Sequence, residues 1–150
     1  MADRFAALLA GLWAGLLVGI GAVAAPAAFA TLPAQEAGRV VGRMFAIDAY
    51  TSLAIAVVLL LFVRRRRRAD ADAARGSQFS HELMLLLGTL ACTVGGYFAV
   101  LPMMEAARVG QGALSFGALH AISAGAFVVK GLFVLALAWR LGGLRTIAPS

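Results

Sequence analysis

The chain has 150 residues, of which 62% are hydrophobic and only 13% are charged, a balance outside the range of soluble domains. The net charge of +6 would suggest nucleic acid for a soluble protein, but most of the arginines stand beside apolar runs. We therefore expect anionic lipid headgroups as the partner, and no nucleic acid. The single cysteine, Cys92, excludes a disulfide within the chain.

Four apolar stretches are long enough to cross a bilayer, which takes about 20 residues of helix. They contain Gly and Pro at helical spacing and lack the alternation of a membrane barrel strand. The sequence therefore predicts an all-α fold, with residues 1–150 forming a single transmembrane domain, a four-helix bundle of up-down topology. The expected spans are about 5–25, 43–63, 83–101 and 116–141, with a basic linker over 64–82.

The first thirty residues support two interpretations. Arg4, an apolar stretch and the small-residue ending Ala28 to Ala30 resemble a cleavable signal peptide, although the apolar part is longer than the usual core of about 7 to 15 residues. Gly11, Gly15 and Gly19 are spaced by four, which creates a helix face where another backbone can approach closely. This pattern favours a membrane span with a packing seam, and it leaves cleavage open.

Prolines and a serine set the expected helix limits. Pro26 and Pro33 are expected to end the first span, and a second helix is expected over about 34–63. That helix would be roughly 45 Å long, so its first two turns should project beyond a hydrocarbon core of about 30 Å. Pro102 is expected to end or kink the third span, and Ser115 to cap the fourth helix.

Arginines are concentrated on one side of the predicted membrane domain. Four spans place both termini and the linker on that side, with Arg4, Arg64, Arg65, Arg66, Arg67, Arg68, Arg75, Arg140 and Arg145. The other side has only three arginines, offset by two glutamates. The positive-inside rule therefore predicts both termini in the cytoplasm of a bacterial inner membrane. The run from Arg64 to Arg68 is interpreted as a stop-transfer signal and an anionic-lipid anchor.

Polar side chains within the last three spans follow one helical face each. These faces contain Asp48, Thr51 and Ser52; Thr89, Cys92 and Thr93; and His120, Ser123 and Lys130. An ionisable side chain in the bilayer costs at least about 2.5 kcal/mol and usually faces the bundle interior. The three faces are therefore expected to share one interior.

Helix rise predicts that Asp48 and His120 lie at the same depth, each roughly 6 to 8 Å below the outer boundary. We predict that they pair. In a functional interpretation the carboxylate orients the imidazole as a proton relay, substrate contact or metal ligand. In a structural interpretation the two groups satisfy each other in a medium of low dielectric.

Other charged residues are expected above and below this pair. Lys130 is predicted to lie deeper, where it would donate to threonines of the third span or snorkel to the inner interface. Arg43, Glu105 and Arg108 would form a charged rim above the pair, or simply be solvated at the interface.

Met103 and Met104 raise the question of a soft-metal site, because a thioether with an imidazole suits copper(I) or a haem axial pair. His81 and His120 are expected at opposite faces, about 25 Å apart, which excludes a bis-histidine haem. A site of His120 with one methionine stays open, against simple packing of the methionines. No nucleophile and base, paired cysteines or phosphate loop argues for an enzyme.

Short motifs run along most of the chain, including Leu12-Trp13-Ala14-Gly15, Ala25-Pro26, Gly42-Arg43-Met44-Phe45, Leu101-Pro102-Met103 and Phe116-Gly117-x-Leu119-His120-x-x-Ser123. They resemble a small membrane family that includes eukaryotic transmembrane protein 205 and bacterial relatives. The resemblance implies a four-helix membrane protein of unsettled role, with a suggested part in tolerance to metal compounds. A more distant similarity is to copper-resistance and haem-associated membrane proteins, from which this chain departs in lacking a second outer histidine.

Three functions follow from these observations. The leading hypothesis is a non-enzymatic transport or accessory protein with an outer-leaflet pocket; its ligand-binding candidates are Arg43, Asp48, Met103, Glu105, His120, Ser123 and Lys130. The second is a haem- or copper-binding redox protein that uses His120 with Met103 or Met104. The third is an assembly partner whose glycine seam binds another copy or another membrane subunit.

Overall fold

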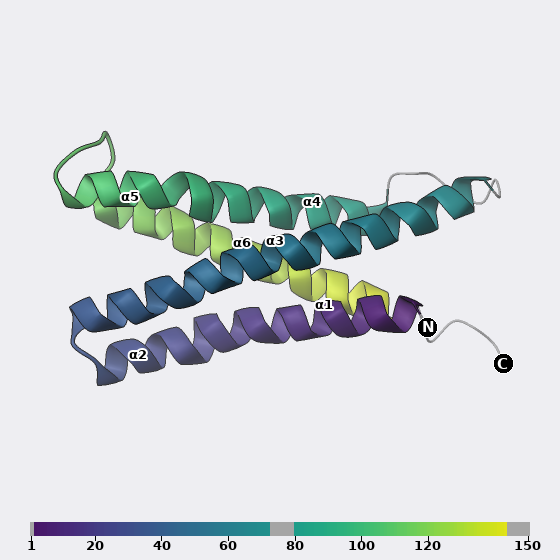
Figure 1. Cartoon of the computed structure of the whole chain (residues 1–150), viewed down its shortest axis with the longest axis horizontal. Coiled ribbons are helices and arrows are strands. Elements are labelled where there is room, and N and C mark those ends of the chain that lie inside the picture. The colour runs from purple at the N-terminus through teal and green to yellow at the C-terminus, as the bar shows by residue number, and fades with distance from the viewer. Residues whose placement is uncertain (1, 73–79, 144–150) are drawn as a thin grey trace.

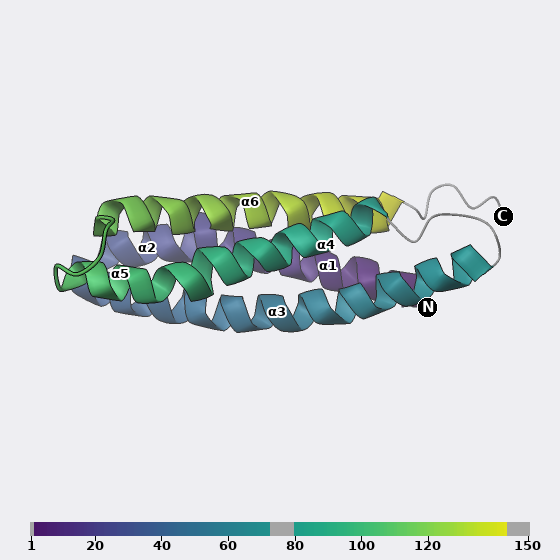
Figure 2. The same cartoon turned by 90° about the horizontal axis from the view of Figure 1, so that it is seen from above.

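The computed structural model describes residues 2–72 and 80–143, which form four long helical segments packed as a bundle (Figures 1 and 2). In chain order these are α1 (Ala2–Val18), the π-helical η1 (Gly19–Ala24) and α2 (Ala25–Thr31); α3 (Ala34–Asp72); α4 (His81–Thr93), the π-helical η2 (Val94–Ala99) and α5 (Val100–Arg108); and α6 (Phe116–Gly143).

Each of the four segments is long and apolar enough to cross a membrane. The candidate spans within the described residues are Asp3–Thr31, Ala34–Arg66, His81–Arg108 and Phe116–Gly143. The all-α fold class, the four spans and the bundle are therefore confirmed. The protein is an integral membrane protein.

Successive segments run in opposite directions, so the connections between them lie at the two ends of the bundle. One end carries the Leu32–Pro33 connection and the loop before Phe116, and we call it the loop end. The other, the arginine end, carries two ion pairs between segments. Arg66 contacts Asp3 at 2.9 Å, and Arg140 contacts Glu82 at 2.9 Å.

The order of helices around the bundle places α3 and α6 at opposite corners. Both α1 and α4 pack against α3 and against α6. A side-chain contact from α3 to α6 therefore crosses the centre of the bundle.

The apolar core lies mainly toward the arginine end. Its buried residues come from all four segments and include Trp13, Leu17, Leu59, Leu86 and Leu137. Toward the loop end, Ala28, Ala37 and Val41 form a separate cluster between α2 and α3.

Toward the loop end the bundle divides into two helical hairpins. There α2 packs on α3 and η1, whereas α5 packs on α6 and η2, and Figure 1 shows the two hairpins diverging. Gly42 on α3 and Ala124 on α6 are both exposed in this half.

Neither Pro26 nor Pro102 ends its helix, contrary to what we expected of Pro26. The helices continue to Thr31 and Arg108, and a π-helical segment precedes each proline. A proline ring clashes with the carbonyl four residues earlier, which here belongs to η1 and η2 respectively. The wider turns of these segments accommodate the ring, so each span bends without stopping.

The second helix does not end at Val63, because α3 continues through the arginine run to Asp72. Arginine is a good helix former, so the helix extends beyond the apolar stretch. The rest of the predicted linker, with Arg75, and the segment with Arg145 lie outside the described residues. The Ser115 cap is confirmed: its Oγ accepts from the Ala118 amide at 3.2 Å.

The predicted glycine seam makes no close helix contact within this chain. A Cβ at Gly11, Gly15 or Gly19 would meet nothing within 4 Å. Other glycines are the close-approach positions: a Cβ at Gly96 would lie 2.4 Å from the Ala126 Cβ. The buried face of α1 is instead formed by Ala6, Ala10, Trp13, Ala14 and Leu17.

Candidate functional site

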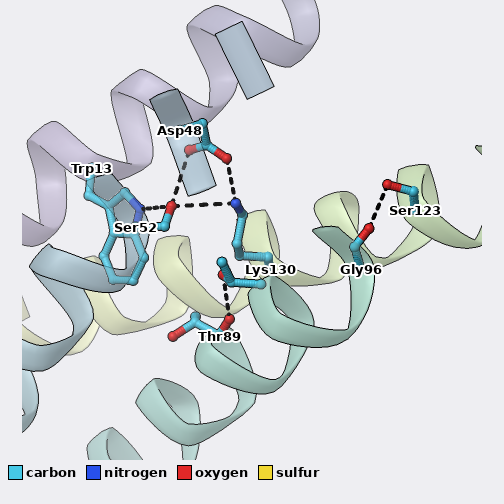
Figure 3. Close-up of polar contacts among 8 residues, drawn as sticks. Trp13, Asp48, Ser52, Thr89, Gly96, Ser123 and Lys130 are labelled. Atoms are coloured by element: carbon cyan, nitrogen blue, oxygen red, sulfur yellow. Dashed lines mark hydrogen bonds and ion pairs between the residues drawn. The ribbon is translucent and has the colours of Figure 1, made fainter. Parts of the chain in front are cut away.

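A buried ion pair crosses the centre of the bundle. The Lys130 Nζ on α6 donates to the Asp48 Oδ2 on α3 at 2.6 Å, and the two side chains are only 5% and 2% exposed (Figure 3). Since α3 and α6 occupy opposite corners, this pair joins the two hairpins directly.

Two further side chains extend the ion pair into a network. The Ser52 Oγ, one turn beyond Asp48 on α3, donates to the Asp48 Oδ1 at 3.1 Å, and the Trp13 Nε1 of α1 donates to the Ser52 Oγ at 3.0 Å. The Lys130 Nζ lies 3.4 Å from the same oxygen. We call Trp13, Asp48, Ser52 and Lys130 the central network.

The buried polar groups of the central network all have hydrogen-bond partners. Within the described ranges, every buried side-chain nitrogen or oxygen has a hydrogen-bond partner. The Lys130 ammonium also lies 5.0 Å from the centre of the Phe127 ring, a distance that favours a cation–π contact. Desolvating two charges costs several kcal/mol per ion, and the pair is tolerated because it is close and fully bonded.

Helix geometry explains why Asp48 meets Lys130. Each lies 14 residues after the first residue of its helix, Ala34 or Phe116, and hence about 21 Å from the loop end. His120 lies ten residues before Lys130, about 15 Å nearer the loop end.

The predicted Asp48–His120 pair is therefore wrong. The prediction placed Phe116 level with Arg43, where the apolar run of α3 begins, whereas the Asp48–Lys130 contact places Phe116 level with Ala34, nine residues earlier on α3. The His120 side chain is exposed, and its ring stacks on Phe116 with centroids 6.1 Å apart.

Lys130 neither donates to the threonines of the third span nor snorkels. It is 4% exposed and bonded to Asp48. The Thr89 and Thr93 hydroxyls instead donate to carbonyls of their own helix, those of Leu86 and Thr89, at 2.7 and 2.8 Å. Hydroxyls in an apolar environment commonly find this local acceptor.

Ser123 holds α6 against the third span. Its hydroxyl donates to the Gly96 carbonyl at 2.7 Å, where the lack of a side chain on Gly96 permits the close approach (Figure 3). The bond connects two helices within one hairpin, and it lies apart from the ion pair.

The remaining candidates lie near the loop end and do not surround Asp48. Arg43, Met103 and Glu105 are exposed, and Met104 is half-buried. Arg43 and Glu105 lie within electrostatic range of the Tyr97 hydroxyl, so the two hairpins do bring these charges to one region. The Arg108 guanidinium, expected at the rim, lies 4.9 Å from the Phe116 ring centre.

The predicted pocket is thus divided between two levels. Asp48 belongs to the buried centre with Lys130, whereas Arg43, Met103, Glu105 and His120 belong to the exposed loop-end half. Across residues 2–72 and 80–143, no three His, Cys, Asp or Glu side chains cluster as metal ligands. His120, Met103 and Met104, the residues considered for a copper or haem site, all lie in the loop-end half.

Sequence analysis missed Trp13 as a member of the network. Tryptophans in membrane proteins usually lie at the interfaces, whereas Trp13 lies in the middle of a span. A buried indole needs a partner for its N–H, so this position could have predicted a hydrogen bond inside the bundle. Trp13 is 1% exposed and lies between the first and second segments.

The fold and the central network define a four-span integral membrane protein with a charged centre. Residues 8–113 match the model of a family described as a domain of unknown function, DUF4149, and the chain belongs to that family. No curated protein and no solved structure matched the chain. The matched region contains Trp13, Asp48 and Ser52, whereas Lys130 lies beyond it.

Proposed function

We propose that the protein is a small non-enzymatic transport or accessory protein of the bacterial inner membrane, and that its activity depends on the central network. The observation that carries this proposal is the Asp48–Lys130 pair, buried across the bundle where the two hairpins begin to diverge. Ionisable groups inside a membrane bundle are costly, and they commonly mark solute or proton pathways.

The proposed orientation places the arginine end in the cytoplasm. Arg4, the run from Arg64 to Arg68 and Arg140 belong to that end, as the positive-inside rule requires, and the run would bind anionic headgroups. The hairpins then diverge toward the outside, with the ion pair at their base.

An aromatic pair covers the ion pair on its loop-end side. The Phe45 and Phe127 rings meet edge to face with centroids 4.9 Å apart, and each residue precedes its charged neighbour by three positions. A charged solute that entered between the hairpins would displace these rings and then separate Asp48 from Lys130. Its binding would thereby be coupled to movement of one hairpin against the other.

The resemblance to transmembrane protein 205 supports metal compounds as the first solutes to examine. We propose that the chain affects their passage or their tolerance, although its family match names no role.

Accumulation assays test this function. Cells that lack the gene and cells that express it are compared for uptake of a panel of metal compounds, with protein amounts checked by immunoblot. We expect expression to change the accumulation of at least one compound severalfold, and Asp48→Asn or Lys130→Met to abolish the change. Arg66→Gln is the control, because it alters an exposed charge at the arginine end. Equal accumulation with and without the protein, or full activity in both network variants, would contradict the proposal.

A second candidate function, assembly with another membrane subunit or another copy, is favoured by the outward-facing glycines. Gly11 and Gly15 are exposed, and a Cβ on either would meet no atom of the described residues within 4 Å. Gly15→Leu should then abolish copurification of a partner in mild detergent while the protein stays folded. Recovery of the same partner with this variant would exclude the glycine face.

A further inference from the structure

A shallow groove runs along α3 near the loop end, separate from the central network. It has a volume of about 630 Å³ and is lined by Leu32, Glu36, Arg39, Val40, Arg43, Met44 and Ile47. Positions 36, 40, 43 and 47 follow one helical face. Ala37, Val41 and Asp48 form the buried face, so the groove opens away from the bundle, toward lipid.

The groove crosses the boundary between headgroups and hydrocarbon. From Met44 to Val63 the helix has Asp48 as its one charged residue, and these twenty residues span about 30 Å, the thickness of a hydrocarbon core. Arg43 therefore stands at the boundary, and Arg39 lies about one turn farther into the headgroup region.

The polar half of the groove suits a phosphate group. Arg39 and Arg43 are four residues apart on one side of α3, and both are exposed. Among residues 2–72 and 80–143, neither guanidinium forms an ion pair. Guanidinium groups bind phosphate oxygens through paired, charge-assisted hydrogen bonds. Glu36 reduces the positive charge and supplies an acceptor for a headgroup hydroxyl.

The apolar half of the groove suits an acyl chain. Val40 and Ile47 are 41% and 55% exposed. Val40 lies level with the two arginines, and Met44 and Ile47 continue the groove below Arg43. A groove with cations at the headgroup level and apolar side chains beneath them matches the two parts of a phospholipid.

We propose that this groove binds one anionic phospholipid with a hydroxyl-bearing headgroup, such as phosphatidylglycerol. Its phosphate lies between Arg39 and Arg43, a headgroup hydroxyl donates to Glu36, the glycerol backbone lies over Val40, and an acyl chain follows Met44 and Ile47. This site goes beyond the proposed transport function. It also differs from the arginine run, which lies at the other end of α3.

Native mass spectrometry of the detergent-purified chain tests the site by titration with phosphatidylglycerol or phosphatidylcholine. We expect one phosphatidylglycerol to bind the wild type more tightly than phosphatidylcholine does. The double variant Arg39→Gln/Arg43→Gln should bind phosphatidylglycerol at least about tenfold more weakly, because it loses the charge-assisted bonds. The matched control, Arg64→Gln/Arg65→Gln, removes the same charge from the same helix. It should weaken only the diffuse association of anionic headgroups with the arginine run and leave the affinity of the one tight site unchanged. Equal losses in the two double variants, or equal binding of the two lipids, would overturn the proposal.

A second set of measurements separates a lipid from a free anion. Val40→Asn and Ile47→Asn change exposed apolar positions, so the bundle should still fold. Both should weaken phosphatidylglycerol binding severalfold, and inorganic phosphate at the same concentration should not displace the lipid. Displacement by phosphate, with wild-type binding in both asparagine variants, would show a free-anion site and refute the lipid assignment.

Discussion

The arginine-end and loop-end halves of the bundle differ in what holds their helices together. In the arginine-end half, large side chains from all four segments, such as Trp13, Leu59 and Leu137, are buried against one another. In the loop-end half, beyond the Phe45–Phe127 contact, each hairpin packs mainly on itself, and Ala28, Ala37 and Val41 form the core of the first. The first half therefore behaves as one packed unit and the second as two.

The central network marks the level at which one kind of packing replaces the other. Asp48 and Lys130 connect the diagonal helices at this level, where packing between the hairpins diminishes. Apolar groups alone would hold the arginine-end half. The ion pair instead joins the two hairpins through a charged contact.

We expect the largest loss of stability when only one residue of the ion pair is replaced. Lys130→Met or Asp48→Asn leaves the other group buried without its partner, and we expect a loss of about 3–5 kcal/mol in the free energy of unfolding. The measurement is denaturant unfolding of the purified protein in detergent micelles.

The double variant Asp48→Asn/Lys130→Met separates pairing from the loss of each group. It removes both charges, so it should be more stable than either single variant. A double variant whose loss equals the sum of the single losses would show that the two residues do not stabilise each other.

Two adjacent glycines, Gly95 and Gly96, test how closely the helices pack within the loop-end half. Gly96→Ala would place a Cβ 2.4 Å from the Ala126 Cβ, and we expect a loss of about 1–3 kcal/mol as α6 is pushed away. Gly95→Ala meets nothing within 4 Å and should be neutral, or stabilising by up to about 1 kcal/mol through helix propensity. Thermal unfolding in detergent measures both, and equal effects would contradict the close packing at Gly96.

A smaller effect is expected from Trp13→Phe, which keeps an aromatic ring but removes the donor to Ser52. The lost hydrogen bond should lower the free energy of unfolding by about 1 kcal/mol. In a double-mutant cycle with Ser52→Ala, the two losses should not add. Full additivity would show that the indole acts through its volume alone.

The smallest effect is expected at the arginine end. Arg66 and Asp3 form an ion pair with side chains 42% and 63% exposed, so Arg66→Gln should change stability by less than about 1 kcal/mol. Added salt should reduce the difference further, because exposed charges are screened. A large, salt-independent loss would show that this end depends on the pair.

The four spans could be predicted from the sequence, because the length of each apolar stretch decides them. Ser115 could be predicted as a helix cap, because capping depends on neighbouring residues only. The partner of Asp48 was not predictable, because pairing depends on how two helices are aligned along the bundle axis. Aligning Phe116 with Ala34 and not with Arg43 shifts α6 by nine residues, about 14 Å, enough to exchange His120 for Lys130. The outcome at Pro26 depended on the π-helical turn that precedes it, and the outcome at Gly11 on neighbouring helices, neither of which the apolar pattern of one helix reveals.

The diagonal position of the ion pair also bears on how the chain enters the membrane. Asp48 arrives with the first hairpin and Lys130 with the second, so neither charge has its partner while the first hairpin is inserted alone. An aspartate within a span opposes insertion, by up to about 2.5–3.5 kcal/mol at the span centre. We therefore expect the first hairpin to insert less favourably alone than together with α6, which brings the lysine.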